Sequence, residues 1–181
     1  DMHTHVAGPI RKIGEDDLYL EPDTAGVRSG VTTVVDAGSV GAYNLGGFAR
    51  FVAPQATTRV VSFLHAGTLG IFHAPEIRSR EDIDVDSAIE AIKGSDGLVR
   101  GVKVRMVGPA IGLLGIDLPR LAKEIARGGG VPLMVHVGDY ITSDPIAREL
   151  VPVLLNEVLT DGDIVTHTTS HQIGALLDAD G

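Results

Sequence analysis

The feature that most constrains the fold is the alternation of two kinds of apolar segment along the chain. The first kind is short and rich in β-branched residues, as expected for strands buried on both faces of a parallel sheet. The second kind repeats its apolar residues at i, i+3, i+4 and i+7, as an amphipathic helix does. This order predicts βαβ units with right-handed crossovers. The predicted strands are residues 31–35, 59–64, 99–104, 131–135 and 163–166.

Two segments have clear helical spacing. We expect Asp84 and Asp117 to cap their N-terminal ends and Gly94 and Gly128 to close their C-terminal ends. A further apolar stripe, at residues 150–158, contains Pro152, which we expect to break or kink the helix. The apolar positions of the two regular helices are Val85, Ala88, Ile89 and Ile92, and Leu118, Leu121, Ala122 and Ile125.

Length and composition limit the class of protein. A chain of 181 residues can bury one core, so we expect a single domain over residues 1–181. The 44% of hydrophobic residues is too high for a disordered chain. The net charge of -9, with no cluster of lysine and arginine, argues against a nucleic-acid surface. No apolar run approaches the roughly 20 residues that a membrane helix needs.

The absence of cysteine excludes disulfides, thiolate ligands and thiol nucleophiles. Together with the absence of a signal peptide, it favours a cytoplasmic protein. The chain starts with Asp1 rather than Met and stops at Gly181 in a loop-like sequence. We therefore expect a fragment of a longer protein.

Polar residues follow the predicted strands. In parallel α/β folds the site lies at the C-terminal ends of the strands. Groups from five or six strands around one rim favour a barrel over an open sheet, whose site is concentrated at one switch point. Neither of the glycine-rich phosphate-binding motifs of open sheets is present. The polar residues are His3 and His5, Asp36, His65, Lys103, His136 and His167.

The sharpest local motif is Asp1-Met-His3-Thr-His5. On a strand, His3 and His5 point to the same face and can reach one metal ion, while Asp1 lies behind them on that face. A histidine pair at this spacing also arises by chance, and His136 or His167 taken alone is more typical of a hydrogen-bonded core residue. Their joint occurrence on successive strands favours a metal centre.

Lys103 lies inside the apolar strand 99–105, where a bare ammonium is costly and its pKa falls. One interpretation is a lysine that reaches the rim and pairs with a carboxylate. The functional interpretation is a neutral amine that reacts with carbon dioxide. The resulting carbamate is an oxygen ligand able to bridge two divalent metal ions.

Taken together, these segments resemble the amidohydrolase superfamily, and within it the dihydroorotase-like or amidohydrolase/deacetylase metallohydrolase branch. The resemblance covers essentially the whole chain in order. It rests on Asp-x-His-x-His at residues 1–5, Gly30-Val-Thr-Thr-Val-Val-Asp-Ala-Gly38, Gly101-Val-Lys-Val-Arg-Met106, Val135-His-Val-Gly138 and Val165-Thr-His167.

The resemblance implies an α/β fold: a partial TIM (β/α)8 barrel of about six β/α units that lacks the last two strands and the flanking β-sandwich. It implies that His3 and His5 bind the more buried metal, that carboxylated Lys103 bridges, and that His136 and His167 bind the second metal. Two zinc ions are expected, although manganese, iron or cobalt would also fit. The family's Asp after the eighth strand is missing, so the chain is expected to be catalytically incomplete.

The implied activity is metal-dependent hydrolysis of an amide, cyclic amide or ester in a small-molecule substrate, with a homo-oligomer as one possible assembly. Three alternatives stay open. A mononuclear deaminase of the same superfamily would share His3, His5 and His136 but would not need Lys103. The other two are a phosphoesterase with a histidine-pair barrel and a non-catalytic barrel that serves assembly.

Further residues are candidates for the rim of the site. Arg105 faces the same way as Lys103 and could bind a substrate carboxylate or form a structural ion pair. His171 either lines the pocket or lies in a solvated loop, and we favour the loop. We expect the remaining rim candidates, Asp139, His65 and His73, to be structural.

Overall fold

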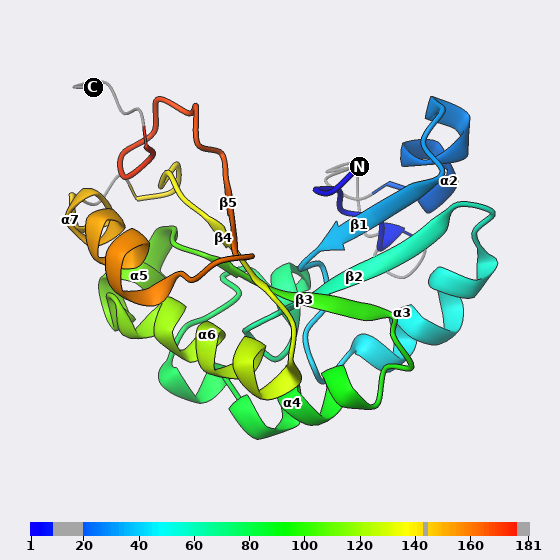
Figure 1. Ribbon diagram of the computed structural model, residues 1–181, viewed down its shortest axis with the longest axis horizontal. Coiled ribbons are helices and arrows are strands. Elements are labelled where there is room, and N and C mark those ends of the chain that lie inside the picture. Colours follow the sequence, from blue (N-terminus) through cyan, green and yellow to red (C-terminus); the bar gives the residue numbers. More distant parts are fainter. Residues whose placement is uncertain (9–19, 143–144, 177–181) are drawn as a thin grey trace.

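A curled sheet of parallel strands organises the molecule. The computed structural model describes residues 1–8, 20–142 and 145–176. Within these ranges, five strands follow the order β1-β2-β3-β4-β5, so each pairs with the next along the chain. The sheet forms a half-barrel (Figure 1), which confirms the predicted partial barrel. The strands are β1 (Thr33–Ala37), β2 (Arg59–His65), β3 (Val99–Arg105), β4 (Leu133–His136) and β5 (Ile164–Thr166).

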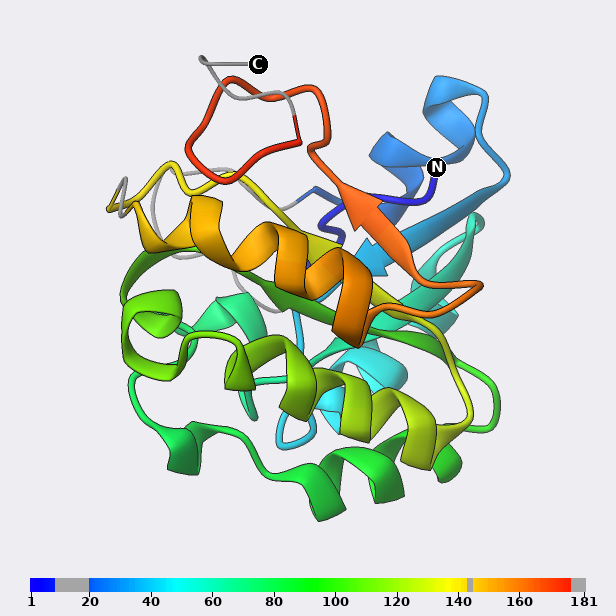
Figure 2. The same ribbon diagram turned by 60° about the vertical axis from the view of Figure 1, so that its left-hand side comes forward.

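Helices cover the outer face of this sheet. Helix α4 packs on α6, and α6 packs on β3 and β4. Figure 2 shows α4, α6 and α7 stacked along that face. Within the described residues, no helix combines the length and apolar character needed to cross a membrane. The helices are α2 (Pro22–Ala25), α3 (Leu45–Phe51), α4 (Val85–Lys93), α5 (Gly108–Leu114), α6 (Asp117–Gly129) and α7 (Ile146–Val153), with 3₁₀ turns at Val27–Ser29, Ala53–Gln55, Gly70–Phe72 and Arg80–Asp82.

The predicted ends of α4 are confirmed, whereas those of α6 are wrong by one or two residues. The Asp84 carboxylate accepts a hydrogen bond from the Ser87 N–H at 3.0 Å. Helix α6 instead includes Asp117 as its first residue, and it ends at Gly129 with Gly130 as the C-cap, whose φ of 69° is left-handed. Gly128 has another role, because a Cβ there would lie 2.3 Å from the Ile89 side chain. Its missing side chain lets α6 approach α4 closely.

Pro152, where we predicted a break or a kink, is the last residue but one of the regular helix α7. Helix α7 runs through Pro152 to Val153 and continues as a π-helical turn, Leu154–Val158. The Leu159 N–H bonds to the carbonyl of Leu154, five residues back, at 3.0 Å. Proline lacks the N–H that would donate to the carbonyl four residues before it, so one bond of the regular helix is lost upstream of this wider turn. The irregularity therefore lies after the proline.

The segment that carries His3 and His5 runs parallel to β1, but it is not a full strand. It forms a single bridge, between Thr4 and Asp36. Pairing stops there because the Val6 N–H donates to the Asp36 carboxylate, at 2.8 Å, and not to a backbone carbonyl. The expected first strand is thus reduced to one bridge, and the sheet itself has the five strands β1–β5.

The two faces of the sheet differ in character. Side chains on the outer face join the main core beneath the helices. On the inner face, Phe63 and Met134 form a small apolar cluster with Ala37. Two residues further along their strands, His65 follows Phe63 and His136 follows Met134. Because side chains alternate along a strand, these residues share the inner face. A polar layer therefore lies above an apolar one, at the C-terminal ends of the strands.

Candidate metal centre

Four histidines gather at the C-terminal ends of the strands. The ring centroids of His3 and His5 are 5.5 Å apart, and those of His3 and His167 are 5.0 Å apart. The rings of His136 and His167 lie 4.0 Å apart. These side chains come from the N-terminal segment, the end of β4 and the residue after β5. The structure therefore brings together all four histidines that the sequence proposed as ligands.

Lys103 lies at the centre of this group. Its side chain is fully buried in β3. Its Nζ lies 3.1 Å from His3 Nε2 and donates to the Ala37 carbonyl at 3.5 Å. Among residues 1–8, 20–142 and 145–176, no carboxylate forms an ion pair with it. Burial, together with the positive charge of Arg105, lowers the pKa of Lys103 to about 7. A large fraction of this amine is therefore neutral near pH 7.

The histidines are held in their neutral form. Burial, reinforced by the charge of Lys103, lowers the pKa of His3 to about 4 and that of His5 to about 3. Burial next to His167 lowers the pKa of His136 to about 2. Burial and Lys103 also lower the pKa of His167. A neutral imidazole has the lone pair that a metal ion needs.

The donor chemistry of this group suits a divalent metal ion. Neutral imidazoles are common ligands of zinc, and a carboxylated lysine would add oxygen ligands. In the part of the chain that the structure describes, no three His, Cys, Asp or Glu side chains are arranged as a metal-binding group. The histidine rings contact one another at their edges and faces instead. The residue types and their proximity fit a metal centre.

A buried hydrogen-bond network supports His5. The Asp36 carboxylate accepts from the Ser39 hydroxyl at 2.7 Å and from the Ser39 N–H at 2.8 Å. The Ser39 hydroxyl lies 3.3 Å from His5 Nδ1. Burial raises the pKa of Asp36, against the hydrogen bonds from Ser39 and Val6. This network fixes the chain where it turns away from β1, directly after His5.

Arg105 forms the structural ion pair that the sequence left open. Its guanidinium donates to both carboxylate oxygens of Glu76, at 2.7 and 3.4 Å, and to the Tyr140 hydroxyl at 2.8 Å. The side chains of Arg105 and Glu76 are only 13% and 10% exposed. Burial opposes the charge, but Glu76 outweighs it and raises the pKa of Arg105. Direct binding of a substrate carboxylate by Arg105 stays a prediction.

The other rim candidates occupy different settings. His65 is buried; its Nδ1 accepts from the Gly67 N–H at 2.9 Å, while its Nε2 has no partner among the described residues. Burial lowers the pKa of His65 to about 4. His73 Nε2 is also buried without a described partner. His171 is exposed and its Nε2 lies 3.4 Å from the side-chain nitrogen of Gln172; a role for His171 in the substrate pocket stays a prediction.

Asp139 has the structural role that the sequence predicted. Its side chain is buried and its Oδ1 accepts from the N–H groups of Gly108, Ile141 and Thr142, at 3.1, 2.8 and 3.2 Å. These bonds join the loop after β4 to the start of α5. They fix the backbone on both sides of Tyr140.

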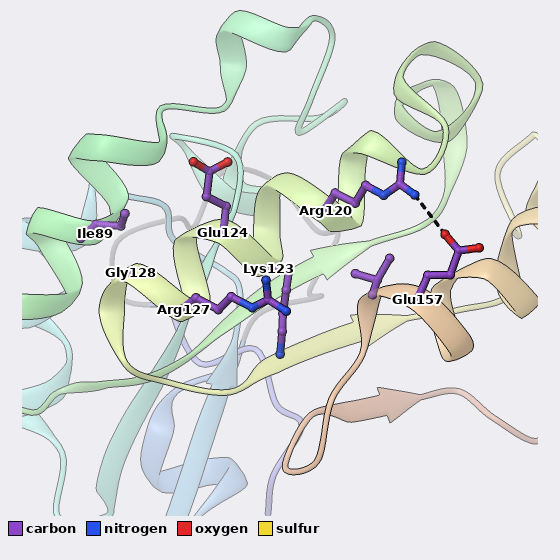
Figure 3. A pocket seen from close by; sticks show the side chains of 8 residues that line it. Ile89, Arg120, Lys123, Glu124, Arg127, Gly128 and Glu157 are labelled. Atoms are coloured by element: carbon purple, nitrogen blue, oxygen red, sulfur yellow. Dashed lines mark hydrogen bonds and ion pairs between the residues drawn. The ribbon is translucent and has the colours of Figure 1, made fainter.

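Two hollows lie on different sides of the half-barrel. One, of about 510 Å³, is lined by Arg105, Glu76 and Tyr140, next to the histidines. A wider groove of about 800 Å³ lies among α4, α6 and the π-helical turn. Figure 3 shows that charged side chains line this groove and that Arg120 reaches Glu157 across it. The groove on the helix side holds none of the candidate ligands.

The sequence did not identify three residues of the site: Ser39, Glu76 and Tyr140. Each lies in a loop and acts through a partner that is distant in the sequence. Tyr140 could have been suspected, because it follows His136 by four residues and its ring lies 5.8 Å from that of His136. Nothing near Glu76 in the sequence marks it as the partner of Arg105.

No protein-family model matches the chain. A curated protein named deacetylase, from Brucella anthropi, is 33% identical over 186 residues, which is 99% of this chain and 42% of that protein. A solved structure titled as a dihydroorotase is 33% identical, with a TM-score of 0.77, over 97% of this chain and 46% of that one. Another, titled as an adenine deaminase, is 33% identical, with a TM-score of 0.81, over 98% of this chain and 45% of that one. The chain thus spans less than half the length of these relatives.

Proposed function

This chain belongs to the amidohydrolase superfamily, and we propose that it forms the metal-binding part of a hydrolase acting on an amide, cyclic amide or ester in a small molecule. The observation that carries the proposal is the cluster of four neutral histidines around a buried lysine. The similarity to a protein named deacetylase, to a dihydroorotase and to an adenine deaminase supports a hydrolase. Residues 1–181 would then be one incomplete barrel domain.

Each residue of the cluster has a proposed role. His3 and His5 would hold one divalent ion, and His136 and His167 would hold a second, with zinc as the expected metal. Such ions supply a hydroxide near neutral pH and polarise the carbonyl group that is attacked. Lys103 would bridge them as a carbamate.

The environment of Lys103 favours carbamate formation. The neutral amine nitrogen bonds to the carbon of carbon dioxide and releases one proton, which leaves a carboxylate on Nζ. A lysine with an ordinary pKa is almost entirely protonated at pH 7, whereas the pKa of Lys103 is about 7. The conversion also replaces a buried cation by an anion that neighbouring metal ions would neutralise.

A mononuclear deaminase is the second candidate. The structure titled as an adenine deaminase, with its TM-score of 0.81, favours it. In that case His3, His5 and His136 would hold one ion and Lys103 would not be needed. A non-catalytic barrel would keep the fold but would not need neutral, clustered imidazoles. For the expected location we retain the cytoplasm, on the grounds of the missing cysteines.

The test compares two lysine variants of the full-length protein. Hydrolysis of an acetyl ester such as 4-nitrophenyl acetate is measured before and after treatment with a chelator, and again after zinc is added. We expect chelation to abolish hydrolysis and zinc to restore it. Lys103→Met should lose bound metal and activity, whereas Lys93→Met, at the exposed end of α4, should retain both. Full activity and metal content in Lys103→Met would refute the binuclear centre and favour the mononuclear deaminase.

A further inference from the structure

A buried ion pair ends at the hydroxyl of Tyr140. Glu76 holds Arg105 through two hydrogen bonds, and Arg105 donates a third to the Tyr140 oxygen at 2.8 Å. The guanidinium carbon also lies 5.7 Å from the centroid of the Tyr140 ring. The side chains of Arg105 and Glu76 are nearly buried, whereas Tyr140 is 52% exposed. The buried pair therefore orients a group that faces outward.

The direction of the last bond determines what Tyr140 can do. An arginine side chain has donors only, so the phenolic oxygen is the acceptor. The hydroxyl hydrogen of Tyr140 is therefore not used by Arg105. A hydroxyl whose oxygen accepts from a cation is also polarised, which strengthens the hydrogen bond that it donates.

The backbone that carries Tyr140 is fixed as well. Asp139 Oδ1 accepts from Gly108 on one side and from Ile141 and Thr142 on the other. The Asp139 N–H donates to the Ile173 carbonyl at 2.7 Å. A tyrosine held at both its backbone and its hydroxyl loses little entropy when it binds a ligand.

Tyr140 lies close to His136 and also lines a cavity. Its ring lies 5.8 Å from that of His136. Tyr140 also lines the cavity of about 510 Å³, whose apolar walls include Ile71, Val107 and Ile141. The positive charge of Arg105 inside this cavity is already paired with Glu76. Such walls suit an apolar group better than a second charged one.

We propose that Tyr140 donates its hydroxyl hydrogen to the carbonyl oxygen of a small amide or ester, and that the apolar substituent of that molecule occupies the adjoining cavity. Arg105 and Glu76 are the positioning residues that fix the hydroxyl. This inference rests on the proposed hydrolase function and names the class of substrate: a neutral acyl compound with an aromatic or branched aliphatic substituent.

The test measures the binding of benzamide, which combines an amide oxygen with an apolar ring. Its Kd is determined by ligand-observed NMR on the full-length protein, and bound metal is counted in the same samples. Tyr140→Phe removes one hydrogen bond and should weaken binding by about fivefold. Tyr43→Phe is the matched control, because the Tyr43 hydroxyl bonds to Asp84 at the start of α4, away from the cavity. This control should bind benzamide as the wild type does.

The positioning role predicts a specific pattern. Glu76→Gln should weaken binding in the wild-type background and have almost no further effect in Tyr140→Phe, because Glu76 acts only through the Tyr140 hydroxyl that this variant lacks. If Glu76→Gln does not fold, the double variant Glu76→Gln with Arg105→Gln takes its place in the comparison. The double variant leaves no unpaired buried charge.

Each outcome separates this inference from the proposed function. Equal binding by the wild type and Tyr140→Phe, or no binding of benzamide by the wild type, overturns the role of Tyr140. Additive effects of Glu76→Gln and Tyr140→Phe overturn the role of the ion pair. Bound metal is independent of these results. If the purified wild type contains no metal but binds benzamide through Tyr140, that result contradicts the metal centre and supports this inference.

Discussion

The buried ion pair between Lys123 and Asp163 gives the most quantitative prediction. Asp163 precedes β5, the strand that leads to His167. Its carboxylate accepts from the Lys123 ammonium and from the N–H groups of Leu133 and Thr160, the last two at 2.9 and 2.8 Å. The side chains of Lys123 and Asp163 are 9% and 3% exposed. Helix α6 is thus joined to the start of the strand that positions a candidate ligand.

The change Asp163→Asn removes the negative charge and replaces one acceptor oxygen by a donor. It costs the charged hydrogen bond to Lys123, about 2 kcal/mol, and one backbone hydrogen bond, about 1 kcal/mol. We expect the free energy of unfolding to fall by about 3 kcal/mol, at the lower end of the range for a broken buried pair. Urea unfolding, followed by circular dichroism, measures this difference.

The matched control is Glu157→Gln. Glu157, in the π-helical turn after α7, pairs at 3.2 Å with Arg120, which lies in α6 as Lys123 does. Both side chains are at least half exposed, Glu157 at 59% and Arg120 at 50%. Such a pair contributes less than about 1 kcal/mol. A loss in Asp163→Asn no larger than in Glu157→Gln would refute the assignment of a stabilising buried pair.

The same pair predicts a dependence on pH. Burial alone would raise the pKa of Asp163, but the hydrogen bonds from Lys123, Leu133 and Thr160 outweigh it and hold the pKa below that of an ordinary aspartate. A carboxyl with a lower pKa in the folded state stabilises the protein above its unfolded pKa, and this contribution is lost as the pH falls through the folded value. The difference between wild type and Asp163→Asn should therefore be constant near neutral pH and shrink below about pH 4. A difference that grows on acidification would contradict this.

Two glycines lie where side chains would collide with the inner face. A Cβ at Gly38 would lie 2.8 Å from the Lys103 side chain, and the φ of Gly38 is 91°. Gly38→Ala should therefore lower the free energy of unfolding by about 3 kcal/mol and reduce the bound metal. Urea denaturation and metal analysis measure the two effects. The control is Gly130→Ala, because Gly130 has a φ of 69° but no atom within 4 Å of an added Cβ. It should lower the free energy of unfolding by only about 1 kcal/mol and leave the bound metal unchanged. Equal loss of metal in Gly38→Ala and Gly130→Ala would contradict the crowding at Lys103. A Cβ at Gly101 would lie 2.7 Å from the Phe63 ring, so Gly101→Ala should destabilise by about 2 kcal/mol. A melting temperature equal to that of the wild type would contradict this packing.

The sequence predicted the parts of the site that depend on strand periodicity. Lys103 and His136 lie on β3 and β4 where the apolar runs placed them, and parallel pairing brings them to one rim. His3 and His5 were predicted on a strand, but Asp36 takes the Val6 N–H and ends the pairing at Thr4. The strand pattern could not reveal this, because the competing acceptor is a side chain.

The loops could not be predicted in the same way. The partners Glu76 and Arg105 are 29 residues apart, and no local pattern connects them. Ser39 reaches His5 across 34 residues by the same kind of contact. Helix ends were predicted to within two residues, since Gly130 and not Gly128 adopts the left-handed conformation that ends α6. Tertiary contacts decide these features, and sequence spacing does not contain them.

The central claim is that His3, His5, Lys103, His136 and His167 surround two divalent metal ions. The most direct measurement is anomalous X-ray scattering from crystals of the full-length protein, together with the electron density of Lys103. We expect two anomalous peaks among these side chains and a Lys103 extended by a carboxylate that bridges the two ions. An unmodified Lys103 with one metal ion, or with metal bound elsewhere, would contradict it.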